Sequence, residues 1–185
     1  MSSAPYSFLS LTRPARNGWP ALLGAWLPVL LLLSLFCLES STLFGADHTS
    51  APLHSLTRAV AGAQFDSHWT LVHHLIRKTG HFLGYGLFSL VLLRSLTFTL
   101  RPGCSWLTAG YRMQWMAIAG TFAIASLDEI HQAFLPNRTG KFADVLLDTA
   151  GALALQLFLC FLGQILSWMQ TYSGIDFISS RRFAA

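Results

Sequence analysis

The residues of this chain best suited to chemistry gather in one stretch between two strongly apolar segments. Half of the eight acidic residues lie there, and basic groups accompany them: Asp128, Glu129, Asp144 and Asp148 with His131, Arg138 and Lys141. Charge placed beside apolar segments is costly unless a partner neutralises it. The stretch therefore predicts either a functional site or a set of ion pairs.

Spacing places these groups on two helix tips joined by a turn. Asp128 is three residues before His131 and four before Gln132, so a helix continuing past Leu127 would end in a polar tip. Pro136 disfavours helical geometry in the residue before it, which predicts a helix end near that point and a turn over residues 136–140. We expect Phe134 and Leu135 to tuck this tip back into the membrane or the bundle. Asp144 and Asp148 are four residues apart and share the next helix face.

A second polar face lies earlier in the chain. His74, Lys78, His81 and Tyr85 follow the i, i+4, i+7, i+11 spacing of one helix face. We expect the donors of both regions to meet the carboxylates in one cluster: Lys78, His81, Arg138 and Lys141 against Asp128, Glu129, Asp144 and Asp148.

Three interpretations of this cluster compete. In the first, ion pairs lock helices together, because buried ion pairs can specify an arrangement while adding little net stability. In the second, Lys78, Arg138 and Lys141, flanked by Tyr85 and Phe134, hold an anionic lipid head group or a lipid-linked phosphate, since arginine suits bidentate phosphate contact. The residues of that binding site would be Lys78, His81, Tyr85, Asp128, Glu129, Gln132, Arg138, Asp144 and Asp148.

The third interpretation is catalysis on an envelope lipid. His81 or His131 would act as general base, oriented by Asp128 or Asp144, so the catalytic candidates are His81, Asp128, Glu129 and His131. Such an enzyme would be a transferase or hydrolase of a lipid-linked substrate. The chain has neither a Gly-x-Ser-x-Gly elbow nor a His-Glu-x-x-His motif, and we expect no metal and no cofactor.

Composition identifies the class of protein that holds these groups. The 185 residues are 53% hydrophobic and 11% charged, against about 25% charged in soluble domains. The basic residues stand in ones and twos at the ends of apolar runs, which is typical of topology anchors and argues against nucleic-acid binding. Cys37, Cys104 and Cys160 have neither metal-type spacing nor a disulfide pattern.

The apolar runs predict an all-α integral membrane four-helix bundle. The expected spans are residues 19–38, 79–99, 113–127 and 145–169, with residues 68–78 forming an interfacial helical extension continuous with the second span. Residues 39–66 would form a loop that includes a short surface helix. Residues 1–18 and 170–185 would be cytoplasmic tails around a membrane domain of residues 19–169. The first run is longer than a signal-peptide core and lacks a small-x-small cleavage site, so we expect it to be retained.

Positive charge predicts the orientation. Most arginines away from the cluster fall in the N-terminal tail, the 98–112 loop and the C-terminal tail, so these should face the cytoplasm and the cluster should face outward. Arg77, Lys78, Arg138 and Lys141 then lie outside, as partners of local carboxylates. Four spans without evident inverted repeats argue against a transporter. The sequence specifies no oligomeric state.

Three spaced polar blocks give the chain a family resemblance over about residues 70–160. It resembles the VanZ-like family of small bacterial membrane proteins through Lys78-x-x-His81-Phe82-x-x-Tyr85, Ser126-x-Asp128-Glu129-x-x-Gln132-x-Phe134-x-Pro136-x-Arg138 and Asp144-x-x-x-Asp148-x-x-Gly151. Asp148 stands where the family pattern leads us to expect Asn, which makes this site more acidic. The resemblance implies an inner-membrane protein that modulates susceptibility to teicoplanin-type glycopeptides. It implies contact with membrane lipids or a lipid-linked cell-wall precursor, and it supplies no reaction.

Overall fold

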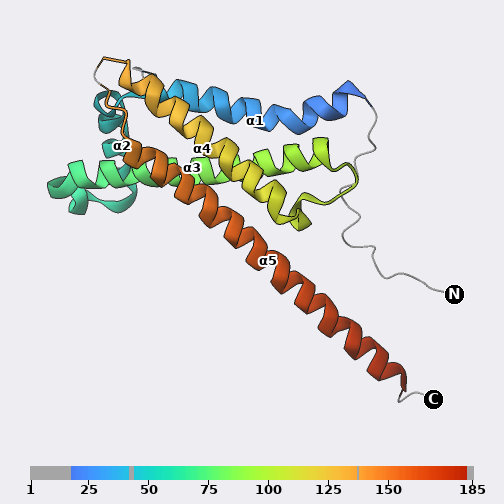
Figure 1. Cartoon of the computed structure of the whole chain (residues 1–185). Helices are drawn as coiled ribbons and strands as arrows, with labels where there is room; N and C mark the ends of the chain where they lie inside the picture. The colour runs from blue at the N-terminus through green and yellow to red at the C-terminus, as the bar shows by residue number, and fades with distance from the viewer. Residues whose placement is uncertain (1–17, 42–43, 137, 183–185) are drawn as a thin grey trace.

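A computed structural model describes residues 18–41, 44–136 and 138–182, and the fold of these residues is entirely helical (Figure 1). The predicted all-α class is confirmed. The predicted N-terminal tail lies, apart from its last residue, outside the described residues. The elements are α1 (Trp19–Ser40), α2 (Ala46–Ala61), the 3-10 helix η3 (Ala63–His68), α3 (Trp69–Leu100), the 3-10 helix η4 (Trp106–Thr108), α4 (Tyr111–Ala133) and α5 (Phe142–Arg182).

Three helical segments are long and apolar enough to cross a membrane. They are Trp19–Ser40, Ala63–Leu100 and Phe142–Met169. In α1 the buried residues Ala25, Val29, Phe36 and Ser40 form one stripe, whereas leucines such as Leu27, Leu31 and Leu35 are exposed around it. A helix that is apolar on both its packed and its exposed faces is typical of a membrane span.

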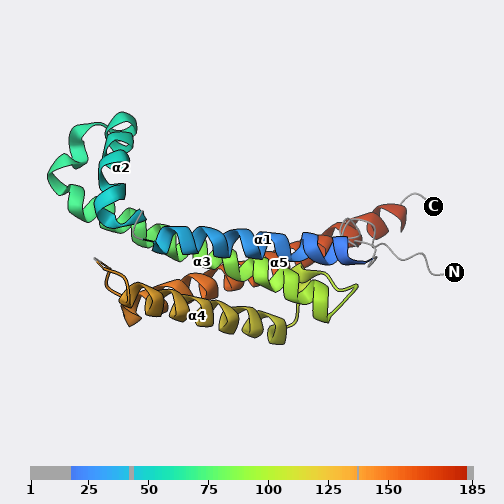
Figure 2. The same cartoon turned by 90° about the horizontal axis from the view of Figure 1, so that it is seen from above.

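Helix α3 lies at the centre and contacts all three other long helices (Figures 1 and 2). Its contacts with α5 are the most extensive. Lys78 lies beside Asp144 and Ser89 beside Gln156, so α3 and α5 run parallel. Ser95 donates to the carbonyl of Ala25, near the start of α1, so α1 runs antiparallel to α3.

Helix α4 also runs antiparallel to α3. Leu92, late in α3, packs at Gly120 in the first half of α4, whereas Tyr85, earlier in α3, donates a hydrogen bond to Asp128 near the end of α4. Its buried residues lie on one helix face: Ala117, Ile118, Thr121, Ala125, Glu129 and Gln132. The predicted third span of residues 113–127 lies inside this helix, although α4 is not among the three apolar candidates for crossing a membrane.

A close crossing fixes the register between α3 and α5. A Cβ atom placed on Gly151 would clash with the carbonyl oxygen of Phe82, and one on Gly86 would lie 2.9 Å from the Gly151 oxygen. Only glycine permits this approach of two backbones. The crossing sets the Lys78 and His81 turn of α3 directly against the Asp144 and Asp148 turn of α5.

Helix α2 and η3 stand away from the long helices at one end of the molecule (Figure 2). His54 of α2 contacts Asp66 of η3 at 2.9 Å, which joins these two elements. Trp69, the first residue of α3, donates from Nε1 to Ser50 Oγ of α2 at 2.8 Å, which fixes α2 to the start of α3. α2 is the helix expected between residues 39 and 66. The predicted continuous helix from residue 68 through residue 99 is present as α3.

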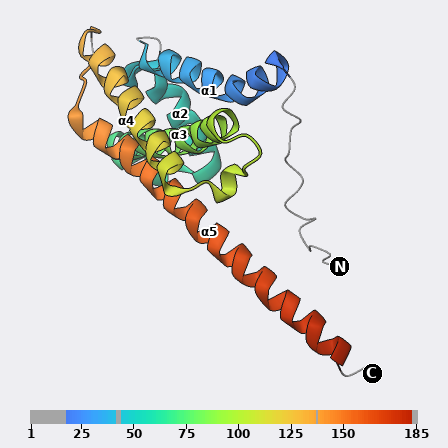
Figure 3. The ribbon, with the colours of Figure 1, turned by 45° about the vertical axis from the view of Figure 1, so that its right-hand side comes forward.

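Helix α5 extends well past the other helices (Figures 1 and 3). Its 41 residues correspond to about 60 Å at 1.5 Å per residue. The chain remains helical through Arg182, so most of the segment expected as a tail after residue 169 continues this helix.

Candidate functional site

Asp128 joins three helices at the end of the molecule where α1 and α4 finish. Its Oδ2 accepts hydrogen bonds from Tyr85 Oη at 3.0 Å and from Gln132 Nε2 at 3.1 Å. Its Oδ1 accepts from Ser40 Oγ on α1. Three donors on three different helices thus satisfy one carboxylate, as buried charge requires. Phe36 stacks on Tyr85 with ring centroids 4.3 Å apart and holds the phenol in place.

Two pairs connect α3 to α5 beside this network. Lys78 Nζ lies 2.5 Å from Asp144 Oδ1, and both side chains are largely covered. His81 Nδ1 lies 3.5 Å from Asp148 Oδ1, and Asp148 is fully buried. On its other side, His81 Nε2 lies 3.8 Å from Oε1 of Glu39, at the end of α1. One imidazole therefore stands between two carboxylates.

Glu129 anchors the loop between α4 and α5. Its Oε2 accepts a hydrogen bond from the backbone N–H of Lys141 at 2.7 Å. Burial raises the pKa of the Glu129 carboxyl above its usual value, and the Lys141 hydrogen bond opposes that rise. A Cβ on Gly140 would clash with the Glu129 carbonyl oxygen, so the loop can approach α4 this closely only through glycine.

Arg138 binds backbone oxygens. Its Nη2 donates to the carbonyls of Glu39 at 2.5 Å and Ser41 at 2.7 Å. The last carbonyls of a helix lack intrahelical donors, so a guanidinium is a favourable cap for the end of α1. Arg138 thus makes its hydrogen bonds to backbone carbonyls, although the carboxylates of Glu39, Asp128 and Glu129 lie near enough to act on its charge. We call the groups of this region the charged cluster: Glu39, Lys78, His81, Asp128, Glu129, Arg138, Asp144 and Asp148.

A cavity of about 320 Å³ opens beside the charged cluster, between the first turns of α3 and the loop leading into α5. We call it the basic pocket. Its lining includes four cations, three histidines and a single carboxylate: Arg77, Lys78, Arg138, Lys141, His73, His74, His81 and Asp144. Thr70, Thr139 and Gln132 complete it with neutral polar groups. This lining suits an anion.

The structure brings most of the predicted site residues together and separates a few. Lys78, His81, Gln132, Arg138 and Asp144 line the basic pocket. Behind it lie Tyr85, Asp128, Glu129 and Asp148, within the packed helices: Tyr85, Glu129 and Asp148 are buried and Asp128 is half-buried.

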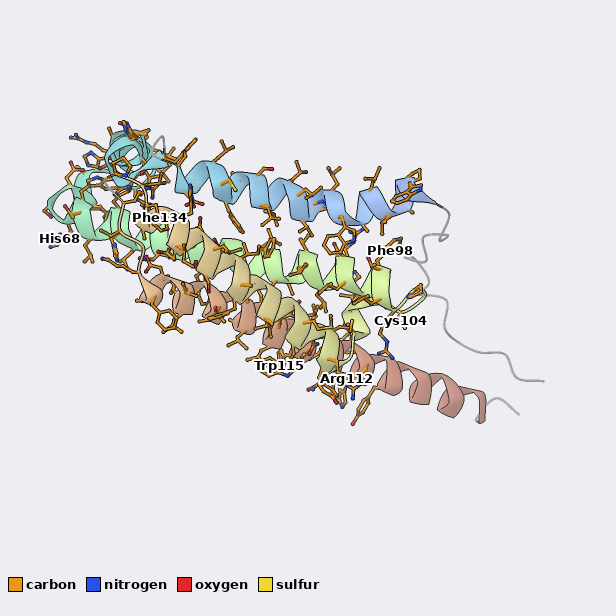
Figure 4. The ribbon with its side chains drawn as sticks, turned by 45° about the horizontal axis from the view of Figure 1, so that its top comes forward. His68, Phe98, Cys104, Arg112, Trp115 and Phe134 are labelled. Atoms are coloured by element: carbon orange, nitrogen blue, oxygen red, sulfur yellow. The ribbon has the colours of Figure 1, made fainter. Side chains whose placement is uncertain are left out.

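The tip of α4 differs in part from the expectation. His131 is exposed and does not line the pocket. Phe134, labelled in Figure 4 at the same end as His68, is 84% exposed and does not pack into the bundle, whereas Tyr85 is buried. The reason is geometric: α4 ends at Ala133, and its buried stripe passes through Glu129 and Gln132 on the opposite side of the last turn.

Sequence reasoning missed several participants. Glu39 belongs to the charged cluster through its contact with His81, and Ser40 donates to Asp128 of the cluster. Glu39 could have been found from the sequence, because it is the first charge after the apolar run of α1 and lies on the same side as the cluster. His73 also lines the pocket, together with His74 and Arg77, which the sequence placed near the cluster without assigning them to the binding site.

Among the described residues, no group of three or more His, Cys, Asp or Glu side chains is arranged to hold a metal ion. Buried atoms of the cluster lack hydrogen-bond partners there, including both carboxylate oxygens of Asp148 and Oε1 of Glu129. The His81 contact compensates Asp148 electrostatically at 3.5 Å, just beyond good hydrogen-bond geometry.

Comparison with protein families decides the assignment. The family model described as VanZ/LLP1 matches residues 21–163, which is most of the chain and includes every residue of the charged cluster. The chain belongs to the VanZ/LLP1 family. Searches of curated proteins and of solved structures returned no match. Membership and the apolar helices together show a membrane protein of VanZ type.

Proposed function

We propose that this VanZ-type protein binds the anionic head group of a membrane lipid or lipid-linked cell-wall component in the basic pocket. Binding there would modulate susceptibility to teicoplanin-type glycopeptides. The observation that carries the proposal is the pocket lining, in which four cationic side chains face one carboxylate. Uncompensated cations at a half-enclosed surface attract anions and hold them through charge-assisted hydrogen bonds.

The proposed setting is a bacterial inner membrane crossed four times, with both termini in the cytoplasm. Residues 113–127 of α4 would form the fourth span beside the three apolar segments. The alternating directions of α1, α3, α4 and α5 support this arrangement, because they gather the charged cluster at one end and Arg101 and Arg112 at the other. Residues 68–78 of α3 would lie in the outer interface, where lipid head groups are found.

Two cations of the pocket are suited to ligand contact because the fold does not depend on them. Within the described part of the chain, the side chains of Arg77 and Lys141 form no hydrogen bond or ion pair, whereas Lys78 is paired and Arg138 caps α1. The loop contact of Lys141 is made by its backbone N–H, which any substitution except proline retains. Arg77→Gln and Lys141→Gln should therefore remove charge without unfolding the protein.

The test is lipid binding by the purified protein, measured by native mass spectrometry with phosphatidylglycerol and with phosphatidylcholine. Wild type should retain phosphatidylglycerol preferentially. The Arg77→Gln/Lys141→Gln double variant should lose that preference, and a strain producing it should lose any teicoplanin phenotype that wild type confers. Arg58→Gln removes an exposed cation of α2 outside the pocket and serves as the control. If the double variant folds yet keeps both lipid preference and susceptibility, the proposal fails.

The position of His81 favours a second candidate, an acid/base enzyme acting on an envelope lipid. His81 lines the pocket and contacts buried Asp148, the arrangement in which a carboxylate orients an imidazole for proton transfer. Under this alternative His81→Asn and Glu129→Gln should abolish conversion of a lipid-linked substrate, followed by mass spectrometry of the products, and leave binding nearly intact. Unchanged conversion in His81→Asn would exclude the imidazole as the base.

A further inference from the structure

The charges that line the basic pocket do not balance. Of its four cations, Lys78 is matched by Asp144 at 2.5 Å, and the lining offers no second carboxylate. Arg77, Arg138 and Lys141 thus leave the lining a net charge of +3 when the histidines are neutral (four cations minus one carboxylate). Further carboxylates lie behind the lining: Glu129 accepts from the Lys141 backbone N–H at 2.7 Å, Asp128 accepts from Gln132 Nε2 at 3.1 Å, and Asp148 lies 3.5 Å from His81 Nδ1. None of these three lines the pocket itself.

The unmatched cations also repel one another. Burial, followed by the nearby Arg77 guanidinium, lowers the pKa of Arg138, and the carboxylates of Glu39, Asp128 and Glu129 only partly oppose this. Two guanidinium groups from separate segments, α3 and the loop before α5, therefore lie close enough together to repel each other. A ligand with a single negative charge would leave most of this repulsion in place.

We propose that the basic pocket is a diphosphate site that takes a lipid-borne diphosphate in preference to a single-phosphate head group. This inference rests on the proposed function and specifies its ligand class. A diphosphate carries two negative charges as a diester and up to three as a monoester, which matches Arg77, Arg138 and Lys141. Arginine also binds two phosphate oxygens at once through its planar donors.

The neutral lining supports a ligand with many oxygens. Thr70, Thr139 and Gln132 add hydroxyl and amide donors from α3, the loop and α4. His73, His74 and His81 add ring N–H donors along α3. A cavity of about 320 Å³ lies at the small end of the usual range for ligand pockets and can enclose a head group without its lipid chain.

Exposed apolar residues next to the lining offer a path for that chain. Leu71 and Leu75 flank lining residues of α3, and Phe142 follows Lys141. These side chains are 57%, 54% and 67% exposed. An anionic head in the pocket with its hydrocarbon over this apolar surface is the arrangement of a lipid, whereas free diphosphate would gain nothing from it.

The test compares three probes on the detergent-solubilised full chain: farnesyl diphosphate, farnesyl monophosphate and inorganic pyrophosphate. Isothermal titration calorimetry or microscale thermophoresis measures each Kd. We expect farnesyl diphosphate to bind at least about 10-fold tighter than the monophosphate, because it forms additional charge-assisted hydrogen bonds. It should also bind more tightly than pyrophosphate. Arg77→Gln should reduce the affinity for farnesyl diphosphate by about 10-fold and so reduce the ratio of the two farnesyl Kd values, while Arg58→Gln should leave both Kd values unchanged.

Each outcome is decisive. Equal affinity for the two farnesyl probes, both weakened by Arg77→Gln, would overturn the diphosphate inference and leave the anionic head-group function standing. If pyrophosphate binds as tightly as farnesyl diphosphate, the inference that the diphosphate is carried by a lipid is overturned. No pocket-dependent binding of these probes or of phosphatidylglycerol would overturn the proposed function as well.

Discussion

Two cavities of similar size lie at opposite ends of the helices, and their chemistry differs completely. The basic pocket of about 320 Å³ is lined largely by cations, histidines and polar groups. The opposite pocket, of about 350 Å³, lies between the start of α1 and the end of α3 and is lined by Gly18, Trp19, Ala21, Leu22, Phe98 and Thr99. No ionisable side chain is among these residues. Figure 4 shows the labelled Phe98 at this end and His68 and Phe134 at the other.

The volume of a cavity therefore does not distinguish the candidate binding site from the opposite pocket. The kind of contact that joins the helices around each cavity does distinguish them. At the opposite end, helices are joined by neutral hydrogen bonds such as Trp26 Nε1 to Thr99 Oγ1 at 3.0 Å. At the charged end they are joined through carboxylates, each of which would be costly to bury alone. The carboxylates that join the long helices are therefore concentrated at one end, whereas neutral hydrogen bonds and the Arg94 contact with the Ala25 carbonyl join helices at the other.

The largest expected effect comes from the crossing that positions the charged cluster. Gly151→Ala places a Cβ against the Phe82 backbone oxygen, so α3 and α5 must separate, at a cost of about 3 kcal/mol. Thermal unfolding followed by circular dichroism in one detergent measures the loss. Gly80→Ala is the matched control, because a Cβ there meets nothing within 4 Å and should leave stability equal or slightly higher. Equal melting temperatures for both variants would show that the crossing is looser than described.

The next effect separates the two ends directly. Asp128→Ala leaves the donors of Ser40, Tyr85 and Gln132 without their acceptor and should cost about 2–3 kcal/mol. Thr99→Ala at the opposite end removes two neutral hydrogen bonds of an exposed side chain, the one accepted from Trp26 and the one donated to the Ser95 carbonyl, and should cost about 1 kcal/mol or less. The same unfolding measurement ranks them. A reversed order would mean that the carboxylate network does not stabilise the charged end.

The two arginines that donate to carbonyls of α1 provide a smaller contrast, because Arg138 caps its end and Arg94 contacts a carbonyl inside the helix. Arg138 donates to two α1 carbonyls at 2.5 and 2.7 Å, whereas the exposed Arg94 donates to Ala25 O at 3.3 Å. Arg138→Ala should therefore lower stability by about 1–2 kcal/mol and Arg94→Ala by about 0.5 kcal/mol or less. Hydrogen exchange of the last turn of α1 should rise only in Arg138→Ala. Unchanged exchange there would contradict the cap.

The smallest effect tests whether the Lys78–Asp144 pair is purely structural. Both side chains are partly exposed, so a double-mutant cycle with Lys78→Ala and Asp144→Ala should give a coupling of about 1 kcal/mol. If holding helices together is the pair's only role, Lys78→Asp with Asp144→Lys should restore stability and preserve lipid binding. Restored stability with lost binding is the result expected for a binding pocket.

The sequence predicted the charged cluster in part because helical periodicity is local. The spacing of Lys78, His81 and Tyr85, and of Asp144 and Asp148, defined two faces, and the structure sets these faces against each other. The role of α1 could not be predicted this way, because its sequence is apolar on all sides. Glu39 and Ser40 reach the cluster only through antiparallel packing on α3.

Other differences have equally specific causes. Arg138 was expected to meet a carboxylate, but the unpaired carbonyls at the end of α1 lie within its reach. The basic pocket itself depends on how the loop before α5 folds over α3, and Gly140 permits that approach. No periodic pattern in the sequence encodes such a contact between segments.

Photo-crosslinking with an anionic phospholipid that carries its reactive group next to the phosphate tests the central claim most directly. Peptide mapping by mass spectrometry should locate the label in residues 70–81 and 138–144 around the basic pocket. That label should disappear in Arg77→Gln/Lys141→Gln, and residues 18–22 and 98–99 of the opposite pocket should stay unlabelled. Labelling of both ends alike, or labelling unaffected by the double variant, would contradict the account.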